Sequence, residues 1–351
     1  MKWAIIAPFF DKENIDKCRW VHNFVPSENH EFTLIAPSRP PTNWHEKKVK
    51  VTTRSEWSVH WNQAAAALDT DADGIITVFP QLPSAVGMQK ILRFSNKPVV
   101  AWLFNVGTCS PGMRRRLSQV SLNNIDRFIV HTRREIDIYS EWLNLPRERF
   151  EFVHYQAPAI EVTYEEETES PFITALGSAH RDFPSFFQAV EELDLPTVVA
   201  SGKSALAGIP IPQQVQTPFG ISRADCFRLA QQGRINVIPL LPKDGVTAAG
   251  QVTLVEAMHM GRPIIATRYY GVDDYITHGE TGWLVEPNSP ESLKQAIETL
   301  WNDAELRQRL GENAKRYAQE NFSDPAAGRA LGRILDEVAA GRQGLRTSPA
   351  A

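Results

Sequence analysis

Residues 250–267 read Gly250-Gln-Val-Thr-Leu-Val-Glu256-Ala-Met-His-Met-Gly261-Arg-Pro-Ile-Ile-Ala-Thr267. The segment predicts a short helix that begins after one glycine and ends at another, followed by a buried strand. A glycine at the helix start lets the backbone approach a ligand closely, and the free amides of the first turn attract an anion. We therefore expect an anion site at Gly250, Gln251, Val252 and Thr253. One turn further, Glu256 either binds ligand hydroxyls or lies solvated on an ordinary helix.

Short apolar runs alternate with helical patterns along the whole chain. The expected strands are 4–7, 32–36, 74–79, 98–104 and 128–131, then 172–176, 197–200, 235–240, 263–267 and 282–285. Such alternation is typical of α/β proteins, with parallel sheets covered by helices on both faces. A length of 351 residues favours two domains. We expect two Rossmann-like, doubly wound domains, 1–158 and 159–324, joined by an exposed glutamate-rich crossing.

The carboxyl-terminal part predicts long helices. After Pro290 one helical pattern runs to about Asn321, and Pro325 then interrupts it. A last amphipathic helix is expected at about 325–340, packing on the first domain, and a frayed tail at 341–351.

Composition and charge exclude several classes of protein. With 42% hydrophobic and 22% charged residues the chain is globular. Residues 1–158 hold 20 Lys+Arg against 16 Asp+Glu, a net of +4. Residues 159–351 hold the remaining 17 Lys+Arg and 25 Asp+Glu, a net charge of −8. We therefore expect the first half, not the second, to face an anionic partner. The sequence has no dense stripe of basic residues, so we do not expect a nucleic-acid partner.

The cysteines and the amino terminus bear on location. Cys18, Cys109 and Cys226 form no disulfide or zinc pattern, which favours a reducing compartment. The apolar start Trp3–Phe10 is too short for a signal peptide, and no run of eighteen apolar residues spans a bilayer. We expect a cytoplasmic protein.

Two motifs resemble binding sites but fail on their spacing. Asp69–Gly74 matches half of a calcium loop and contains an Asp-x-Asp pattern, yet the twelfth position is Pro80 and a strand follows. A polar turn is the favoured interpretation. Gly202-Lys203-Ser204 lacks the earlier glycine of a P-loop, because that position is Thr197. The nine histidines form no ligand set, so no protein-bound metal is expected.

The run Gly271-Val-Asp-Asp-Tyr-Ile-Thr-His-Gly279-Glu-Thr-Gly282-Trp-Leu-Val285 extends the pattern of residues 250–267. Together, residues from about 172 to 322 resemble the nucleotide-binding domain of the family 4, or group 1, glycosyltransferases of the GT-B fold. The resemblance implies two Rossmann-like domains facing across a cleft. It also implies a nucleotide diphosphate sugar as co-substrate, retention at the anomeric carbon, and neither an essential metal nor another cofactor.

The resemblance assigns roles to individual residues. Glu256 matches the second glutamate of the family's Glu-x7-Glu signature, which holds the ribose, and residues 250–253 lie where backbone amides hold the diphosphate. Arg181 occupies the position of the phosphate-binding lysine, where a guanidinium can offset charge on the leaving group. Gly220 lies in the loop that borders the base.

Other positions depart from the family pattern. The first glutamate falls at Ala248, and Asp244 is the candidate replacement. The arginine that precedes the lysine falls at Ser178, so Lys203 or Lys243 is expected to supply the second positive charge. Where the family often has a histidine beside the reacting sugar, Asn105 is the candidate sugar contact.

Two clusters in the first half are ambiguous. Trp44, Trp57 and Trp61 near Lys47, Lys48, Lys50 and Arg54 could form a sugar platform or a membrane patch, but core positions for Trp57 and Trp61 are favoured. An apolar stripe at helical spacing lies beside three arginines and either rests on anionic lipid or belongs to a solvated basic face. Its residues are Met113, Leu117 and Val120, with Arg114, Arg115 and Arg116.

We therefore expect a retaining, metal-independent glycosyltransferase that acts on a glycan, lipid or small-molecule acceptor, with possible contact to the inner face of an anionic membrane. Two alternatives remain: a nucleotide-sugar epimerase of the same fold, and a catalytically inactive nucleotide-sugar-binding module, which Ala248 favours. A metal-dependent transferase would require Asp69–Asp73 to bind an ion.

Overall fold

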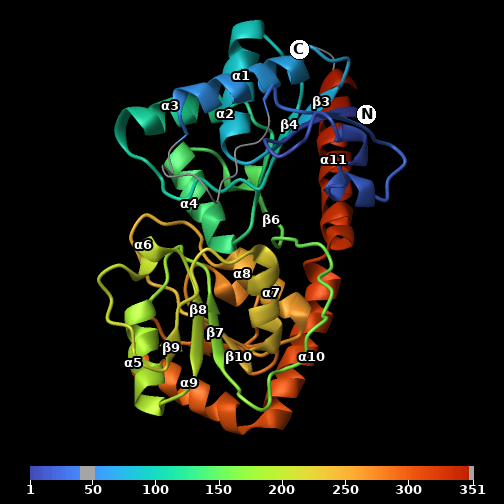
Figure 1. Cartoon of the computed structure of the whole chain (residues 1–351). Coiled ribbons are helices and arrows are strands. Elements are labelled where there is room, and N and C mark those ends of the chain that lie inside the picture. The colour runs from blue at the N-terminus through green and yellow to red at the C-terminus, as the bar shows by residue number, and fades with distance from the viewer. Residues whose placement is uncertain (40–51, 348–351) are drawn as a thin grey trace. The chain divides into compact units, whose positions relative to one another are not determined.

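The computed structural model describes residues 1–39 and 52–347, which form two compact α/β units (Figure 1). Unit 1 comprises Met1–Val153 and Ala327–Ala351, and unit 2 comprises His154–Ala326. Unit 2 thus begins five residues before the expected position 159. The predicted fold class, two Rossmann-like domains with parallel sheets, is confirmed.

Unit 1 contains a parallel sheet with the strand order β2-β1-β3-β4-β5-β6. Its strands are β1 (Lys2–Ile6), β2 (Glu31–Ile35), β3 (Gly74–Val78), β4 (Val99–Trp102), β5 (Arg127–Val130) and β6 (Phe150–Phe152). Its helices are α1 (Arg54–Leu68), α2 (Gln81–Arg93), α3 (Gly112–Leu122), α4 (Arg133–Leu143) and most of α11 (Asp324–Thr347).

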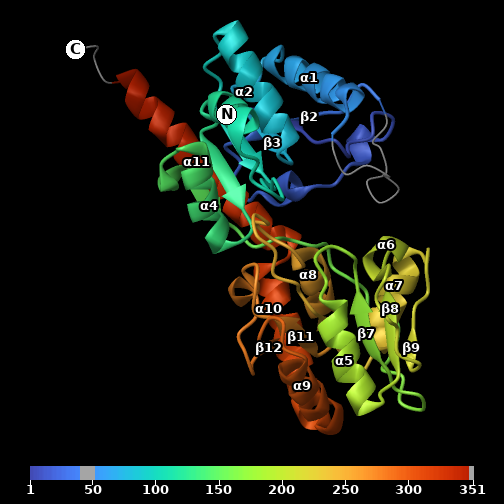
Figure 2. The same ribbon diagram turned by 90° about the vertical axis from the view of Figure 1, so that its left-hand side faces the viewer.

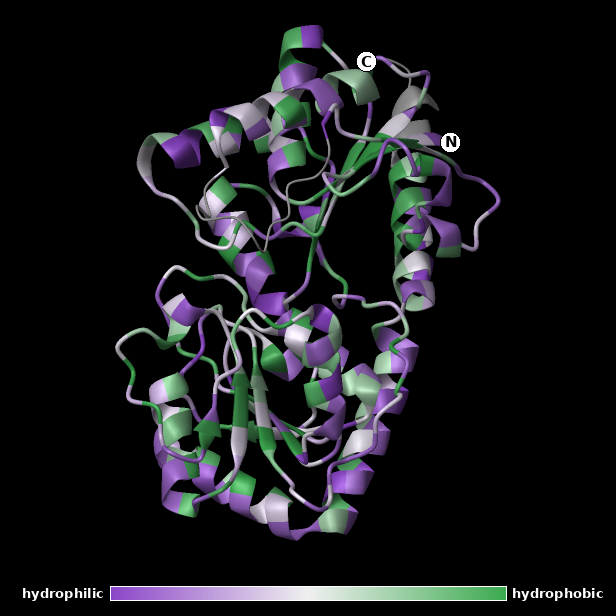
Figure 3. Cartoon of the chain, in the orientation of Figure 1, coloured by the Kyte–Doolittle hydropathy of each residue, from purple (hydrophilic) through white to green (hydrophobic). Residues whose placement is uncertain are grey.

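Two apolar cores cover the two faces of this sheet. Residues of α1 to α4 pack on one face, and α11 packs on the other with the amino-terminal segment (Figure 1). Figure 2 is turned so that the side of α1 to α4 faces the viewer. Gly328 is required for the approach of α11, because an added Cβ would lie 2.2 Å from the carbonyl oxygen of Phe24. Figure 3 shows hydrophobic residues along the central strands, as expected for strands buried on both faces.

Unit 2 has the strand order β12-β11-β10-β7-β8-β9, again all parallel. Its strands are β7 (Ile173–Leu176), β8 (Thr197–Ala200), β9 (Val215–Gln216), β10 (Ile235–Ile238), β11 (Ile264–Thr267) and β12 (Trp283–Val285). Its helices are α5 (Phe183–Leu193), α6 (Lys203–Leu206), α7 (Arg223–Gln232), α8 (Gln251–Met260), α9 (Pro290–Asn302) and α10 (Ala304–Asn321). Strands β8 and β9 are added on one side of β7 and strands β10 to β12 on the other, so the strand order reverses between β7 and β10. Open α/β sheets bind ligands at this position.

The helices after Pro290 differ from the expectation. The predicted single helix to Asn321 is wrong, because Asp303 adopts an extended conformation and its carboxylate caps α10 by accepting a hydrogen bond from the amide of Leu306. Helix α11 extends to Thr347, seven residues past the expected end at about 340.

Two features of unit 1 bear on the ambiguous motifs. The Asp69–Gly74 segment is a turn in which Asp69 pairs with Arg93 and Asp71 pairs with Lys2, as the polar-turn interpretation predicts. The core positions favoured for Trp57 and Trp61 are wrong, because the two side chains are 40% and 39% exposed. Trp44, Lys47, Lys48 and Lys50 lie outside the described residues. Within residues 1–39 and 52–347, no helix is long and apolar enough to cross a membrane.

Candidate functional site

The predicted site residues of unit 2 gather where β7 and β10 end. These two strands are neighbours, and the loop after β7 bridges the loop after β10 through an isolated antiparallel pair, Arg181 with Leu240. Leu241 continues the contact, since its amide donates to the carbonyl oxygen of His180 over 3.0 Å. The carboxyl edge of the unit 2 sheet therefore carries both segments from which the anion site was predicted.

Arg181 is a buried guanidinium held by neutral acceptors. It donates to the carbonyl oxygens of Leu176 (3.2 Å) and Ala179 (2.8 Å), and its Nη2 donates to Oγ1 of Thr253 (3.1 Å). The residue is 8% exposed, and within the described chain no carboxylate lies within ion-pair distance of it. Burial lowers the pKa of Arg181 to about 10, so the side chain stays positive at neutral pH. A buried positive charge without a counter-ion is costly unless an anion binds to it.

The backbone around Arg181 requires glycine. Gly177 has φ +94°, in the left-handed region, and a Cβ there would lie 2.6 Å from Nη2 of Arg181. A glycine is therefore needed at position 177 because the Arg181 guanidinium lies directly beside it.

Helix α8 begins beside this guanidinium. Gly250 precedes it with φ +92°, and no side chain of a described residue caps the helix. The amides of Gln251, Val252 and Thr253 have no acceptor among the residues described, so they are available to an anion. The Gln251 side chain is buried and donates to the carbonyl oxygen of Tyr270 over 2.8 Å, whereas Val252 is exposed. The helix start therefore combines free amides with the Arg181 charge.

Glu256 forms an ion pair that the sequence did not indicate. Its Oε1 lies 2.6 Å from Nη2 of Arg223 at the start of α7, and the carboxylate is largely buried whereas the guanidinium is exposed. Arg223 also lies over the ring of Phe227, 5.0 Å from its centroid. Burial raises the pKa of the Tyr155 phenol, and the nearby Glu256 charge adds to this effect. Glu256 is therefore not a solvated surface residue.

The loop between β10 and α8 is organised by Tyr270. Its hydroxyl donates to the carbonyl oxygen of Leu241 (3.0 Å) and accepts from the amide of Lys243 (2.8 Å). The side chains of Lys243 and Asp244 form no hydrogen bond or ion pair within the described chain. The structure thus places both near the predicted site without bringing them into contact with Arg181 or Glu256.

Lys203 lies with the predicted base-bordering loop rather than with Arg181. Its ammonium is 5.6 Å from the centroid of the Phe219 ring, next to Gly220, which has φ +68°. Ser178 ties the loop after β7 to the loop after β8 by accepting a hydrogen bond from the amide of Gly202 over 2.7 Å. The small residue at 178 is thus a structural contact between the two loops.

Asn105 belongs to unit 1, where it follows β4. Its Oδ1 accepts a hydrogen bond from the amide of Gly107 over 2.7 Å, and the residue is exposed. At the switch point of this sheet, between β1 and β3, Phe9 and Phe79 form an edge-to-face pair with centroids 6.1 Å apart. Both rings are 39% exposed, and Phe79 has φ +72°. Sequence reasoning missed this pair, although an aromatic residue directly after an apolar strand was a visible signal.

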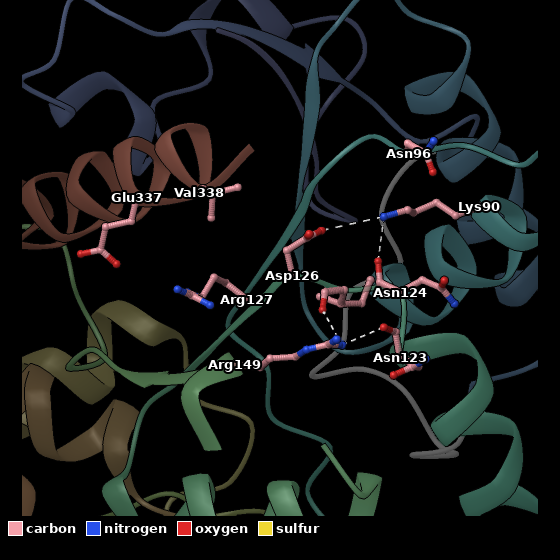
Figure 4. Close-up of a pocket in the computed structure, with 11 residues that line it drawn as sticks. Lys90, Asn96, Asn123, Asn124, Asp126, Arg127, Arg149, Glu337 and Val338 are labelled. Carbon is pink, nitrogen blue, oxygen red and sulfur yellow. Dashed lines mark hydrogen bonds and ion pairs between the residues drawn. The ribbon is translucent and has the colours of Figure 1, made fainter. Parts of the chain in front are cut away.

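A cavity of about 620 Å³ lies at the opposite, amino edge of the unit 1 sheet (Figure 4). Two of its cations serve the fold, because they bind the residues directly after α3. Lys90 donates to the carbonyl oxygen of Asn124, and Arg149 donates to the carbonyl oxygen of Asn123. These contacts neutralise the negative end of a helix dipole. In the described residues, no three His, Cys, Asp or Glu side chains gather into a possible metal site.

Comparisons with known proteins agree with the fold. Residues 212–317, which include α7, the β10–α8 loop and α8, match the family model described as "Glycosyl transferases group 1". A stretch of 71 residues is 41% identical to an uncharacterised glycosyltransferase of Methanocaldococcus jannaschii, covering 20% of this chain and 18% of that protein. A stretch of 87 residues is 37% identical to the alpha-D-kanosaminyltransferase of Streptomyces kanamyceticus, covering 25% and 22%. The chain thus matches about a fifth of each relative's length.

The whole fold has solved counterparts. The structure of Anabaena HepE in complex with UDP-glucose aligns with a TM-score of 0.67 over 96% of this chain and 100% of that chain, at 14% sequence identity. The chain therefore shares the fold of this solved structure, and the predicted resemblance to the group 1 glycosyltransferases is confirmed over residues 212–317.

Proposed function

We propose that the protein, whose second unit is similar to that of the group 1 glycosyltransferases, transfers a sugar from a nucleotide diphosphate sugar to an acceptor. The observation that carries the proposal is the buried Arg181, which lacks a carboxylate partner among the described residues and is fixed beside the uncapped start of α8. A diphosphate leaving group would satisfy both the guanidinium and the free amides.

The chemistry that this arrangement supports is stabilisation of the leaving group. The transition state of glycosyl transfer is positive at the anomeric carbon and negative on the departing diphosphate. Arg181 and the amides of Gln251, Val252 and Thr253 would receive that negative charge, while Glu256 accepts hydrogen bonds from the ribose hydroxyls. No step requires a metal ion, and we propose retention at the anomeric carbon on the strength of the resemblance.

We propose that the acceptor, whether glycan, lipid or small molecule, binds unit 1 at the carboxyl edge of its sheet. The half-exposed Phe9 and Phe79 and the exposed Asn105 lie in the loops there. Aromatic rings provide an apolar surface for a sugar ring or an aglycone, and the amide of Asn105 can meet hydroxyls. We also propose a cytoplasmic location, because Cys18, Cys109 and Cys226 are all free thiols.

The test is calorimetric titration of the protein with UDP, GDP and ADP, with and without a chelator, followed by a transfer assay. Glu256→Ala should weaken the binding of whichever nucleotide the wild type binds. Glu298→Ala, a control at an exposed position of α9, should leave that binding unchanged. Binding that is lost in chelator would overturn the metal-free site. Conversion of the donor without acceptor would favour an epimerase, and tight binding without product from any acceptor would favour an inactive module.

A further inference from the structure

Helix α3 presents polar side chains to unit 1 and apolar side chains to solvent. Of its residues only Ser121 and Leu122 are buried. Arg115 and Gln119 face the body of the unit, where both donate to the carbonyl oxygen of Trp142, over 2.8 and 3.1 Å. Arg115 also donates to the carbonyl oxygen of Glu141. Polar contacts to the end of α4 therefore hold the helix in place.

The outer face of α3 carries the apolar stripe. Met113, Leu117 and Val120 are 68%, 54% and 53% exposed, and their spacing of four and three residues places them on one side of the helix. A helix on a globular protein normally turns such a stripe toward the core, because that burial stabilises the helix. The reversed orientation leaves this apolar surface uncovered by unit 1.

Two arginines flank the stripe. Arg114 and Arg116 are exposed and form no ion pair or hydrogen bond with any described residue. Within α3 there is no carboxylate, and α2, which packs along it, has none either. The surface that covers the stripe should therefore be apolar in its middle and anionic at its sides.

We propose that Met113, Arg114, Arg116, Leu117 and Val120, the α3 docking face, rest on an anionic lipid bilayer. The apolar side chains would enter the boundary between headgroups and acyl chains, and the two arginines would meet lipid phosphates. The exposed Leu92 and Phe94 at the end of α2 add apolar surface on the neighbouring helix.

Other occupants fit the charges less well. A second copy of the chain docking through the same face would bring four arginines together, which costs free energy through like-charge repulsion. A nucleic acid would satisfy the arginines but leave the apolar stripe against a charged backbone. A bilayer with anionic headgroups matches both parts of the face.

The experiment is flotation of the full chain with vesicles of neutral phosphatidylcholine, alone or mixed with phosphatidylglycerol. The protein should float with the mixed vesicles only, and binding should fall as salt rises. Arg114→Gln with Arg116→Gln should weaken binding roughly thirtyfold, since each arginine near an anionic surface contributes about a factor of five. Met113→Ser with Leu117→Ser should weaken it at least about tenfold.

The matched control is Arg309→Gln with Arg316→Gln on α10, which removes the same charge from another exposed helix and should leave flotation unchanged. Thermal unfolding of each variant confirms that the fold is retained. The proposal would be overturned if the protein bound neutral and mixed vesicles equally well, or if it bound neither. It would also be overturned if the control variant lost as much binding as the Arg114→Gln, Arg116→Gln variant. A dimer that forms without lipid and dissociates in the Met113→Ser, Leu117→Ser variant would also overturn it, in favour of self-association.

Discussion

The guanidinium of Arg181 donates a hydrogen bond to the hydroxyl of Thr253, 3.1 Å away, and so joins the loop after β7 to the first turn of α8. Two elements that are 72 residues apart in the chain thereby form one positively charged surface. The amides of α8 contribute partial charge to it, and Arg181 contributes a full charge. A diphosphate bound there would meet both.

Replacing Arg181 should separate transition-state stabilisation from binding. Arg181→Ala is expected to lower kcat by about tenfold to a thousandfold in a transfer assay, because developing charge on the diphosphate loses its cation. Arg181→Lys keeps the charge and should retain more activity. A kcat for Arg181→Ala equal to that of the wild type, in a protein with unchanged thermal stability, would remove Arg181 from the mechanism.

The ion pair between Glu256 and Arg223 makes a second prediction. Glu256→Ala should weaken binding of the preferred nucleoside diphosphate about tenfold to a hundredfold, because hydrogen bonds to a charged carboxylate are lost. Binding of pyrophosphate, which has no ribose, should not change. Calorimetry with both ligands checks this, and an equal loss for the two would show that Glu256 acts through the fold instead.

Local signals explain why part of this site could be predicted from the sequence. Gly250 before an apolar helix and Arg181 after an apolar strand are features of single segments, and the parallel topology then brings those segments to one sheet edge. The pairing of Glu256 with Arg223 could not be predicted, because the two residues belong to different helices and no periodicity relates them.

Orientation is the other property that the sequence pattern left open. Trp57 and Trp61 are one turn apart, which predicts a shared face but not its direction. Ala64 lies on the same face, three residues after Trp61, and it is buried together with Ala67 and Leu68, so α1 is covered in its second half while the tryptophans before it stay exposed. The stripe on α3 is a similar case, since the polar contacts of Arg115 to α4 determine which way the helix faces.

Stability should depend on pH through Glu135. Burial raises the pKa of this carboxyl from 4.5 to about 6, although hydrogen bonds from Tyr139 and Thr132 oppose the shift. The folded state therefore favours the protonated form. The stabilisation is fully present below pH 4.5 and is lost as pH rises through 6, by roughly 2 kcal/mol in total.

Chemical denaturation of the wild type and of Glu135→Gln at several pH values between about 5 and 7.5 measures this dependence. The free energy of unfolding of the wild type should include a loss from Glu135 as pH rises over that range, and Glu135→Gln should lack this loss, whatever its absolute stability. Parallel curves for the two proteins would contradict the raised pKa of Glu135.

Gly87 should be intolerant of a side chain. An added Cβ would lie 1.9 Å from the carbonyl oxygen of Ser121, so Gly87→Ala must push α2 and α3 apart. We expect a loss of about 1–3 kcal/mol in the free energy of unfolding. Gly341→Ala in α11, where nothing lies within 4 Å of the added atom, is the control and should be neutral or slightly stabilising. Equal effects of the two changes would mean that helix propensity, not the α2–α3 contact, determines the result.

Gly250 combines a conformational and a ligand-binding requirement, so its replacement should affect both. At φ +92° a residue with a Cβ is strained, and the new atom would lie 3.1 Å from Cδ2 of Leu240. Gly250→Ala should therefore lower the free energy of unfolding by roughly 1–2 kcal/mol. It should weaken nucleotide binding at least about tenfold, because the amides of Gln251, Val252 and Thr253 shift with the helix start.

Gly208→Ala, also at positive φ but with open space around it and far along the chain from α8, should lose stability without losing nucleotide affinity. Full affinity in Gly250→Ala would show that the start of α8 does not hold the diphosphate, and Arg181 would then have to bind it alone.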